Sequence, residues 1–169
     1  MRHGIQMNAL SKIVTAEELS PKLENFRRSG KKIVFTNGCF DILHVGHVRY
    51  LAAARSEGDL LVVGLNADAS IRLIKGGLRP IVKQEHRAEV LASLGSVNYV
   101  VLFDDPDPLK LIQVLQPDVL VKGEDWTEDN IVGAEFVKSI AGRVVRIALV
   151  PDASTSSIIE KVIEIYRRS

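Results

Sequence analysis

The sequence predicts an α/β protein built on a doubly wound parallel sheet, because short apolar runs alternate with amphipathic segments along the chain. The runs are rich in β-branched residues and apolar on both faces or nearly so, as expected for strands buried between two helical layers. A turn with two histidines follows the first run, at a strand-to-helix crossing. Right-handed crossovers would place this turn at the carboxyl ends of the strands, where such sheets bind ligands.

The elements follow one another in the order βαβαβα, without an internal repeat or a low-complexity tract. The predicted strands are Lys32–Phe35, Leu60–Leu65, Tyr99–Phe103, Val119–Val121 and Val144–Leu149. Apolar residues at helical spacing predict the buried helix faces. These faces are Val48, Leu51 and Ala52; Val82, His86, Val90, Leu91 and Leu94; Leu111, Ile112 and Leu115; and Ile158, Ile159, Val162, Ile165 and Tyr166.

Residues 1–30 are expected to form a helical extension before a single domain over 31–169. Thr15 and Glu18 have the spacing of a capping box, and Ser20-Pro21 offers a second N-cap with a proline in the first turn. Gly30 stands where a helix would end. The extension could pack on the sheet or on a partner subunit, so a homodimer is possible.

Composition excludes several classes of protein. With 169 residues and 46% hydrophobic residues, one core is expected, and no apolar stretch approaches the roughly 20 residues that span a bilayer. A net charge of +1 without a basic block disfavours a nucleic-acid partner. The N-terminus lacks the apolar core of a signal peptide, which predicts a cytoplasmic location. The single cysteine, Cys39, is interpreted as a packing residue because no Cys/His nucleophile pair accompanies it.

The most informative segment is Thr36-Asn37-Gly38-Cys39-Phe40-Asp41-Ile42-Leu43-His44-Val45-Gly46-His47. Its histidines lie at a predicted helix N-terminus, where unpaired N–H groups and the helix dipole favour phosphate. Gly46 would leave room for a ligand to approach the backbone. A lone histidine is usually a surface residue and Gly38 could be an ordinary turn glycine, but their combination indicates a nucleotide site.

This segment resembles the nucleotidylyltransferase superfamily, whose sequences show a glycine, then Phe-Asp, then His-x-Gly-His after the first strand. The matching residues here are Gly38, Phe40-Asp41 and His44-Val45-Gly46-His47. The resemblance implies a Rossmann-like nucleotidylyltransferase fold. It also implies that His44 and His47 embrace the triphosphate and steady the transition state.

Further polar segments fall just after predicted strands. Asp68, in Asn66-Ala67-Asp68, is interpreted as the N-cap of a short helix ending near Ile74. Lys75-Gly76-Gly77-Leu78-Arg79-Pro80 is a glycine-hinged loop with two cations, which could be solvated surface or could lower a lysine onto a triphosphate. The family resemblance implies the second role for Lys75. Arg87 could be a solvated charge beside Glu85 or Glu89, whereas the family has an arginine here that faces the site.

The last two segments complete the predicted site. Lys122-Gly123-Glu124-Asp125-Trp126 can frame the base and ribose with its backbone and Asp125, Lys122 could reach phosphate, and Trp126 could stack or merely pack. Ser154-Thr155-Ser156-Ser157 is expected to cap the closing helix, and a phosphate site at the same helix end is compatible with capping.

Together these spacings resemble, from about Gly30 to Tyr166, the adenylyltransferases of ADP-heptose synthesis, with departures at Glu124, Trp126 and Ser157. The resemblance implies AMP transfer from ATP to D-glycero-D-manno-heptose 1-phosphate for lipopolysaccharide or surface-glycan precursors, with Mg²⁺ arriving on ATP. In many bacteria this domain is fused behind a sugar kinase, and the chain looks like the stand-alone form. The sugar phosphate would attack the α-phosphorus of ATP in line, without an enzyme nucleophile.

Three groups of residues are assigned on this basis. The catalytic group is His44, His47 and Lys75; the nucleotide group is Thr36, Asn37, Gly38, Cys39, Phe40, Gly46, Lys122, Gly123, Asp125, Ser154, Thr155 and Ser156; and the sugar-phosphate group is Asp41, Arg79 and Arg87. No protein metal site is expected. Two alternatives stay open: a cytidylyltransferase for glycerol 3-phosphate or a similar phosphorylated alcohol, and a non-catalytic nucleotide-binding module, against which intact His44, His47 and Lys75 argue.

Overall fold

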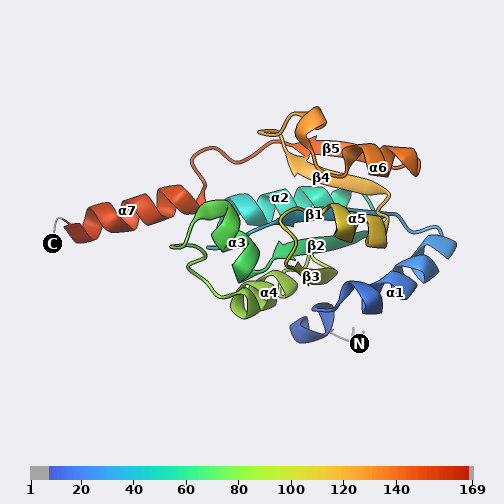
Figure 1. The fold of residues 1–169 in the computed structure, drawn as a ribbon, viewed down its shortest axis with the longest axis horizontal. Coiled ribbons are helices and arrows are strands. Elements are labelled where there is room, and N and C mark those ends of the chain that lie inside the picture. The colour runs from blue at the N-terminus through green and yellow to red at the C-terminus, as the bar shows by residue number, and fades with distance from the viewer. Residues whose placement is uncertain (1–7, 168–169) are drawn as a thin grey trace, which may run out of the picture.

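The computed structural model describes residues 8–167 and contains one parallel sheet of five strands in the order β3-β2-β1-β4-β5 (Figure 1). The strands are β1 Ile33–Gly38, β2 Leu60–Asn66, β3 Tyr99–Phe103, β4 Val119–Gly123 and β5 Arg143–Ile147. Every neighbouring pair is parallel. The doubly wound sheet is confirmed, and its order reverses beside β1, so the ligand crevice is expected between the carboxyl ends of β1 and β4.

Helices cover both faces of the sheet. Leu51 of α2 (Val45–Ser56) and Leu91 of α4 (Gln84–Ala92) belong to the core on one face. The core on the other face is supplied by α1, α5 and α6, which span Ala16–Arg28, Leu109–Leu115 and Ala134–Ser139. Short helix α3 (Asp68–Lys75) follows β2, and single 3-10 turns cover Ala9–Lys12 and Glu128–Asn130. None of the described helices is long and apolar enough to cross a membrane.

The strands differ from prediction mainly at their ends. β1 continues to Gly38 and β4 to Gly123, so several predicted site residues are the last residues of strands. β5 begins at Arg143, ends at Ile147 and is half-exposed rather than buried. It lies at the edge of the sheet, where only β4 pairs with it.

Two predicted helix faces were wrong in part. α4 buries Arg87, Ala88, Leu91 and Ala92 and leaves Val90 exposed, because a charged side chain that is hydrogen-bonded within the protein, here through all three guanidinium nitrogens, can occupy a core position. In α2, the buried residues are Tyr50, Leu51 and Ala54, whereas Val48 and Ala52 face outward. The face predicted for α5 is correct, since Leu111, Ile112 and Leu115 are all buried.

Helix α7 (Thr155–Arg167) projects from the body of the protein (Figure 1). No described residue of α7 is buried, and Tyr166 is 77% exposed. The helix and its apolar stripe were therefore predicted correctly, but its burial was not.

The predicted extension packs on the sheet. Leu19 and Leu23 of α1 are fully buried, and the N–H of Val14 donates to the carbonyl of Val100 in β3 at 3.0 Å. The capping box of Thr15 and Glu18 is confirmed, and Gly30 adopts a φ of 77° just after the helix. The second N-cap at Ser20-Pro21 was wrong, because Pro21 lies inside one continuous helix. The domain boundary at residue 30 stays a prediction, and residues 1–7 lie outside the described part.

Candidate active site

Two adjoining cavities open at the carboxyl ends of β1 and β4. The first, of about 400 Å³, is lined by residues of the histidine segment and of the segments after β4 and β5, together with Lys75. The second, of about 370 Å³, shares Cys39, Phe40, His47, Lys75, Asp125 and Thr155 with the first and adds Asp41, Arg79 and Ser156. Most of the predicted site residues therefore gather at one place, which has the size of an ordinary small-molecule site.

The two histidines stack on one another at the start of α2. His44 is the N-cap residue, and the ring centroids of His44 and His47 lie 3.8 Å apart with 27° between the planes. The ring of Phe40 meets His47 edge-on at 5.1 Å, and Phe40 has a φ of 42°, a strained value for a residue other than glycine. The packing holds both imidazoles at the helix N-terminus, where a phosphate would bind.

Burial favours the neutral form of both imidazoles. Burial lowers the pKa of His44, and burial together with the neighbouring His44 lowers the pKa of His47 to about 4. The Nδ1 atoms of both rings are buried, and neither has a hydrogen-bond partner among the described residues. Buried polar atoms without partners are rare in stable structures and often mark functional sites.

Gly46 lines the first cavity and also makes room for the histidine pair. A Cβ atom at this position would lie 2.9 Å from Cε1 and Nδ1 of His44 and 3.2 Å from the carbonyl oxygen of Ala153. The protein's own imidazole therefore comes close to the Gly46 backbone, and the approach of a ligand to this backbone stays a prediction. The glycine fixes where His44 can stand.

We expect Gly46→Ala to lower kcat by about tenfold or more, because the added methyl group must push the His44 ring off His47. Steady-state kinetics of the folded variant measure this. Gly95→Ala is the matched control, since a Cβ at Gly95 meets nothing within 4 Å. Wild-type kcat in Gly46→Ala would show that the stacked arrangement is not needed.

Asp41 anchors the segment after the glycine loop. Its carboxylate accepts hydrogen bonds from the N–H groups of Ile81 and Val82 at 2.9 and 2.8 Å and from Nε of Arg79 at 2.6 Å. Burial by itself would raise the pKa of Asp41, but these hydrogen bonds outweigh it and hold the pKa below its usual value. Because protein groups occupy the carboxylate, we revise its proposed role from sugar contact to orienting Arg79.

Arg87 is buried and makes three contacts within the protein. Its guanidinium donates to the carbonyls of Val82 at 2.9 Å and Cys39 at 2.6 Å and to Oδ1 of Asp68 at 2.7 Å. The expectation that Arg87 faces the sugar phosphate is therefore revised, since it lines neither cavity. The N-cap assignment of Asp68 was also wrong: Ala67 is the N-cap residue, and the Asp68 carboxylate pairs with Arg87 instead.

Lys75, the last residue of α3, lines both cavities. Gly76 follows with a φ of 92°, which favours glycine, and Leu78 is 91% exposed. Asp41 fixes the chain again from Ile81 onward. The freedom expected for the whole loop is thus concentrated in residues 76–78.

We expect hydrogen exchange at the amides of Gly77 and Leu78 to slow when ATP and sugar phosphate are both bound, because the exposed turn would close over them. The amides of Ile81 and Val82 serve as the internal control, since Asp41 already holds both of them. Hydrogen exchange at residues 76–78 that is the same with and without the two ligands would contradict a closing loop.

The segment after β4 forms the far wall of the first cavity. Lys122 donates from Nζ to Oδ1 of Asn37 at 2.6 Å and lies 5.6 Å from the centre of the Trp126 ring. Burial lowers the pKa of Lys122 to about 8, against the opposing effect of Asp125. Trp126 is about half-exposed and lines the cavity, and whether it stacks on a ligand or only packs stays open.

The serine cluster caps α7 as predicted. The N–H of Ser157 donates to Oγ of Ser154 at 3.0 Å, and the N–H of Ser154 donates back to Oγ of Ser157 at 3.2 Å. Ser157 thus closes a reciprocal cap that a longer side chain often provides. Thr155 donates from Oγ1 to the carbonyl of Ile42 at 3.3 Å, which ties the start of α7 to the histidine segment.

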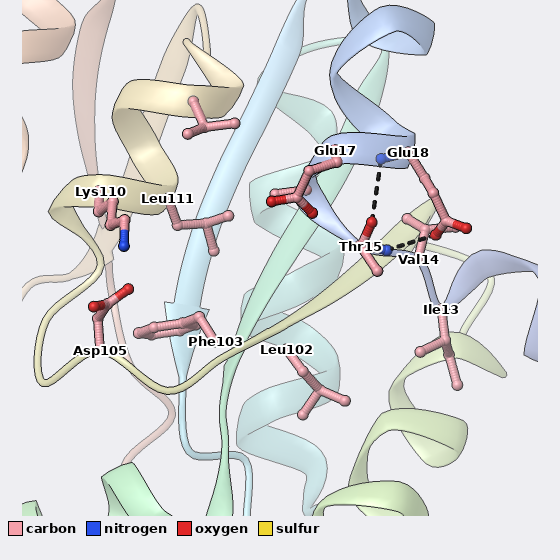
Figure 2. Close-up of a pocket in the computed structure, with 12 residues that line it drawn as sticks. Ile13, Val14, Thr15, Glu17, Glu18, Leu102, Phe103, Asp105, Lys110 and Leu111 are labelled. Atoms are coloured by element: carbon pink, nitrogen blue, oxygen red, sulfur yellow. Dashed lines mark hydrogen bonds between the residues drawn. The ribbon is translucent and has the colours of Figure 1, made fainter.

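A separate groove of about 480 Å³ lies between the start of α1 and α5. Figure 2 shows Thr15, Glu17 and Glu18 on the α1 side and Lys110 and Leu111 on the α5 side. None of its lining residues lines either cavity at the strand ends. It borders β3, the edge strand two positions away from β1, and takes no part in the candidate site.

A family model described as cytidylyltransferase-like matches residues 35–161, a range that includes every residue placed in the two cavities. The chain belongs to the cytidylyltransferase-like family. The predicted membership of the nucleotidylyltransferase superfamily is thereby confirmed, together with its Rossmann-like fold.

Curated relatives of this cytidylyltransferase-like chain are longer proteins. It is 54% identical over 158 residues to the bifunctional protein HldE of Syntrophotalea carbinolica, covering 94% of this chain and 32% of that protein. It is 53% identical over 160 residues to the bifunctional protein HldE of Geobacter sulfurreducens, covering 95% of this chain and 31% of that protein. The chain therefore spans about a third of the length of these relatives.

Solved structures agree on the fold. The lipopolysaccharide core biosynthesis protein of Thermoplasma volcanium GSS1 is 28% identical, with a TM-score of 0.60 over 72% of this chain and 98% of its own. The pantoate-beta-alanine ligase of Francisella tularensis, complexed with beta-gamma ATP and beta-alanine, is 16% identical, with a TM-score of 0.62 over 93% of this chain and 79% of its own. At that identity the likeness concerns the fold alone.

Sequence reasoning missed several lining residues of the cytidylyltransferase-like site, namely Tyr50, Leu149, Val150 and Ala153. Tyr50 lies one helical turn after His47, and that spacing could have indicated it. Its hydroxyl lies 2.8 Å from Oγ1 of Thr36 and donates to the carbonyl of Val121 at 3.2 Å, which joins α2 to β1 and β4. The others follow β5, whose carboxyl end lies at the same edge of the sheet.

Proposed function

We propose that the chain transfers AMP from ATP to D-glycero-D-manno-heptose 1-phosphate, releasing pyrophosphate and forming ADP-heptose for lipopolysaccharide or surface-glycan precursors. The observation that carries the proposal is the stacked pair of His44 and His47, held at a helix N-terminus inside a cavity that Lys75 also lines. Identity above 50% to two HldE proteins over more than nine-tenths of the chain supports the choice of reaction.

We propose that ATP binds in the first cavity. The triphosphate would lie against the histidines and Lys75, because the α2 N-terminus supplies free N–H groups and positive partial charge there. The base would lie toward Trp126 and the backbone of Gly123, and the α7 N-terminus with Ser154 would complete the phosphate contacts. Asn37 to Phe40, at and just after the end of β1, would lie beneath it, whereas Thr36 is buried and lines neither cavity.

We propose that the sugar phosphate binds in the second cavity, next to the α-phosphorus of ATP. Arg79 lines this cavity. Its guanidinium donates from Nε to Asp41, and within the described part of the chain this leaves both Nη atoms for a phosphate. Such a fork suits bidentate phosphate binding. Ser156, assigned from the sequence to the nucleotide, lines the second cavity and not the first, so we reassign its hydroxyl to the sugar.

The chemistry requires positioning and charge stabilisation rather than an enzyme nucleophile. The phosphate oxygen of the sugar attacks the α-phosphorus of ATP while the bond to the pyrophosphate oxygen breaks. His44, His47 and Lys75 then stabilise the charge that grows on the leaving group. Burial raises the pKa of the Cys39 thiol, despite the opposing effect of Lys75, which disfavours the nucleophilic thiolate.

Mg²⁺ is proposed to arrive with ATP and to neutralise charge on its phosphates. Within residues 8–167, no three His, Cys, Asp or Glu side chains gather in a way that could hold a metal ion. Of the two carboxylates lining the cavities, Asp41 is occupied by protein donors and Asp125 stands singly. The phosphates and water would therefore supply most of the ligands. A cytoplasmic location and a homodimer stay predictions.

Release of pyrophosphate from ATP tests the proposed function. The purified protein, with ATP, Mg²⁺ and heptose 1-phosphate, is expected to release pyrophosphate and to form a product with the mass of ADP-heptose. Omitting the sugar phosphate is the control. Pyrophosphate release that needs CTP and glycerol 3-phosphate would favour the alternative cytidylyltransferase, and nucleotide binding without any turnover would favour a non-catalytic module.

A further inference from the structure

Helix α3, which ends at Lys75, is held almost entirely at its start. Helix α3 buries only Ser70 and Ile71, both in its first half. Toward its end Leu73 is 79% exposed and Ile74 is about half-exposed. The packing that could fix the direction of the helix is therefore confined to its first turn.

Polar contacts fix that first turn. The carboxylate of Asp68 accepts from Nη2 of Arg87 at 2.7 Å, and the N–H of Asp68 donates to Oε1 of Gln84 at 2.9 Å. Ser70 adds a hydrogen bond from its hydroxyl to the carbonyl of Asp105 at 3.2 Å. Both Gln84 and Arg87 belong to α4, so α4 holds the start of α3.

Arg87 connects this helix start to the rest of the site. Its side chain is fully buried, and it also donates to the carbonyls of Cys39, in the histidine segment, and Val82, in the segment after the glycine loop. The planar guanidinium fixes the relative position of the three segments because each contact uses a different part of one rigid group. Lysine could not reproduce this arrangement.

We infer that the Asp68–Arg87 pair is a positioning device that sets the place of Lys75 in the active site. Seven residue steps separate Asp68 from Lys75, a distance of about 10 Å along a helix at 1.5 Å per residue. A tilt of about 6° at the start of such a helix moves its end by about 1 Å. A misplacement of that size can cost about 10²-fold in rate. The inference rests on the role proposed for Lys75.

A double-mutant cycle tests this inference. Asp68→Ala removes the acceptor for Arg87 and should lower kcat by about 10- to 100-fold, with KM for ATP changed less than about threefold. In a Lys75→Ala background the same change should alter kcat by less than about twofold, because there is no lysine left to misplace. Asp68→Asn keeps one acceptor oxygen and should restore much of the lost kcat. If Asp68→Ala does not fold, Arg87→Lys carries the cycle, because lysine keeps the charge but cannot make the three contacts of the guanidinium.

Asp118→Ala is the matched control. Asp118 is also a partly buried carboxylate, which accepts from the N–H of Ile33 at 2.9 Å and from Nζ of Lys32 at 3.3 Å, but it lies at the opposite ends of the strands. It should lower the unfolding temperature without lowering kcat. A loss of kcat by Asp68→Ala that is the same in both backgrounds, or no loss at all, would overturn the inference. Wild-type kcat in Lys75→Ala would instead remove the proposed role of Lys75 itself.

Discussion

Replacing either active-site histidine should lower kcat by about 10²-fold or more while leaving KM for ATP nearly unchanged. His44 and His47 form one stacked unit at the α2 N-terminus, and burial lowers the pKa of both imidazoles, which favours their neutral forms. Their hydrogen bonds would strengthen as charge moves onto the leaving pyrophosphate, so the loss should appear in turnover rather than in ground-state binding.

The structure makes this prediction easy to interpret. His44 makes no side-chain cap to α2, so His44→Ala removes no helix cap. His86→Ala on the exposed side of α4 is the control for loss of a histidine outside the site. A folded His44→Ala or His47→Ala variant that turns over at the wild-type rate would contradict the catalytic assignment.

The second large effect is expected in the choice of the phosphorylated acceptor substrate. The ratio kcat/KM for ATP with heptose 1-phosphate should exceed that for CTP with glycerol 3-phosphate by as much as about 10⁴-fold. A site built for a hydroxyl-rich sugar leaves its polar groups unpaired when a smaller acceptor binds, and those unpaired groups cost binding energy in the transition state. Arg79 and Ser156 in the second cavity are the groups proposed to do this.

Arg79→Lys separates the two parts of that prediction. Lysine keeps the charge but loses the fork that Asp41 orients, so kcat/KM for the sugar phosphate should fall while nucleotide affinity is retained. Steady-state kinetics with each substrate varied in turn measure both quantities. A preference for CTP and glycerol phosphate would overturn the heptose assignment but leave nucleotidyl transfer in place.

Local pattern was sufficient to predict the sheet and the position of the site. Strand runs such as Tyr99–Phe103 are apolar enough that their burial follows from composition, and the topology then places their carboxyl ends together. His44, His47, Lys75 and Lys122 were all predicted to be near one another, and all line the first cavity.

The roles of two side chains were not predicted, because they depend on hydrogen bonds to other segments of the chain. The periodicity of apolar residues does not indicate such hydrogen bonds. Arg87 was predicted to contact the sugar phosphate or to be a solvated charge, yet it is buried by partners 5 to 48 residues away along the chain. The carboxylate of Asp41 looked available for substrate, but backbone N–H groups of Ile81 and Val82 occupy it. In both cases a hydrogen bond to a distant segment decided the side chain's role.

The direct test of the central claim is the fate of the α-phosphate of ATP. With ATP labelled at the α-phosphate and heptose 1-phosphate as acceptor, the label is predicted to appear in ADP-heptose, and label in the β- or γ-phosphate should appear only in pyrophosphate. Label from the γ-phosphate on the sugar, or α-label that ends as free AMP independently of the sugar phosphate, would contradict adenylyl transfer at this site.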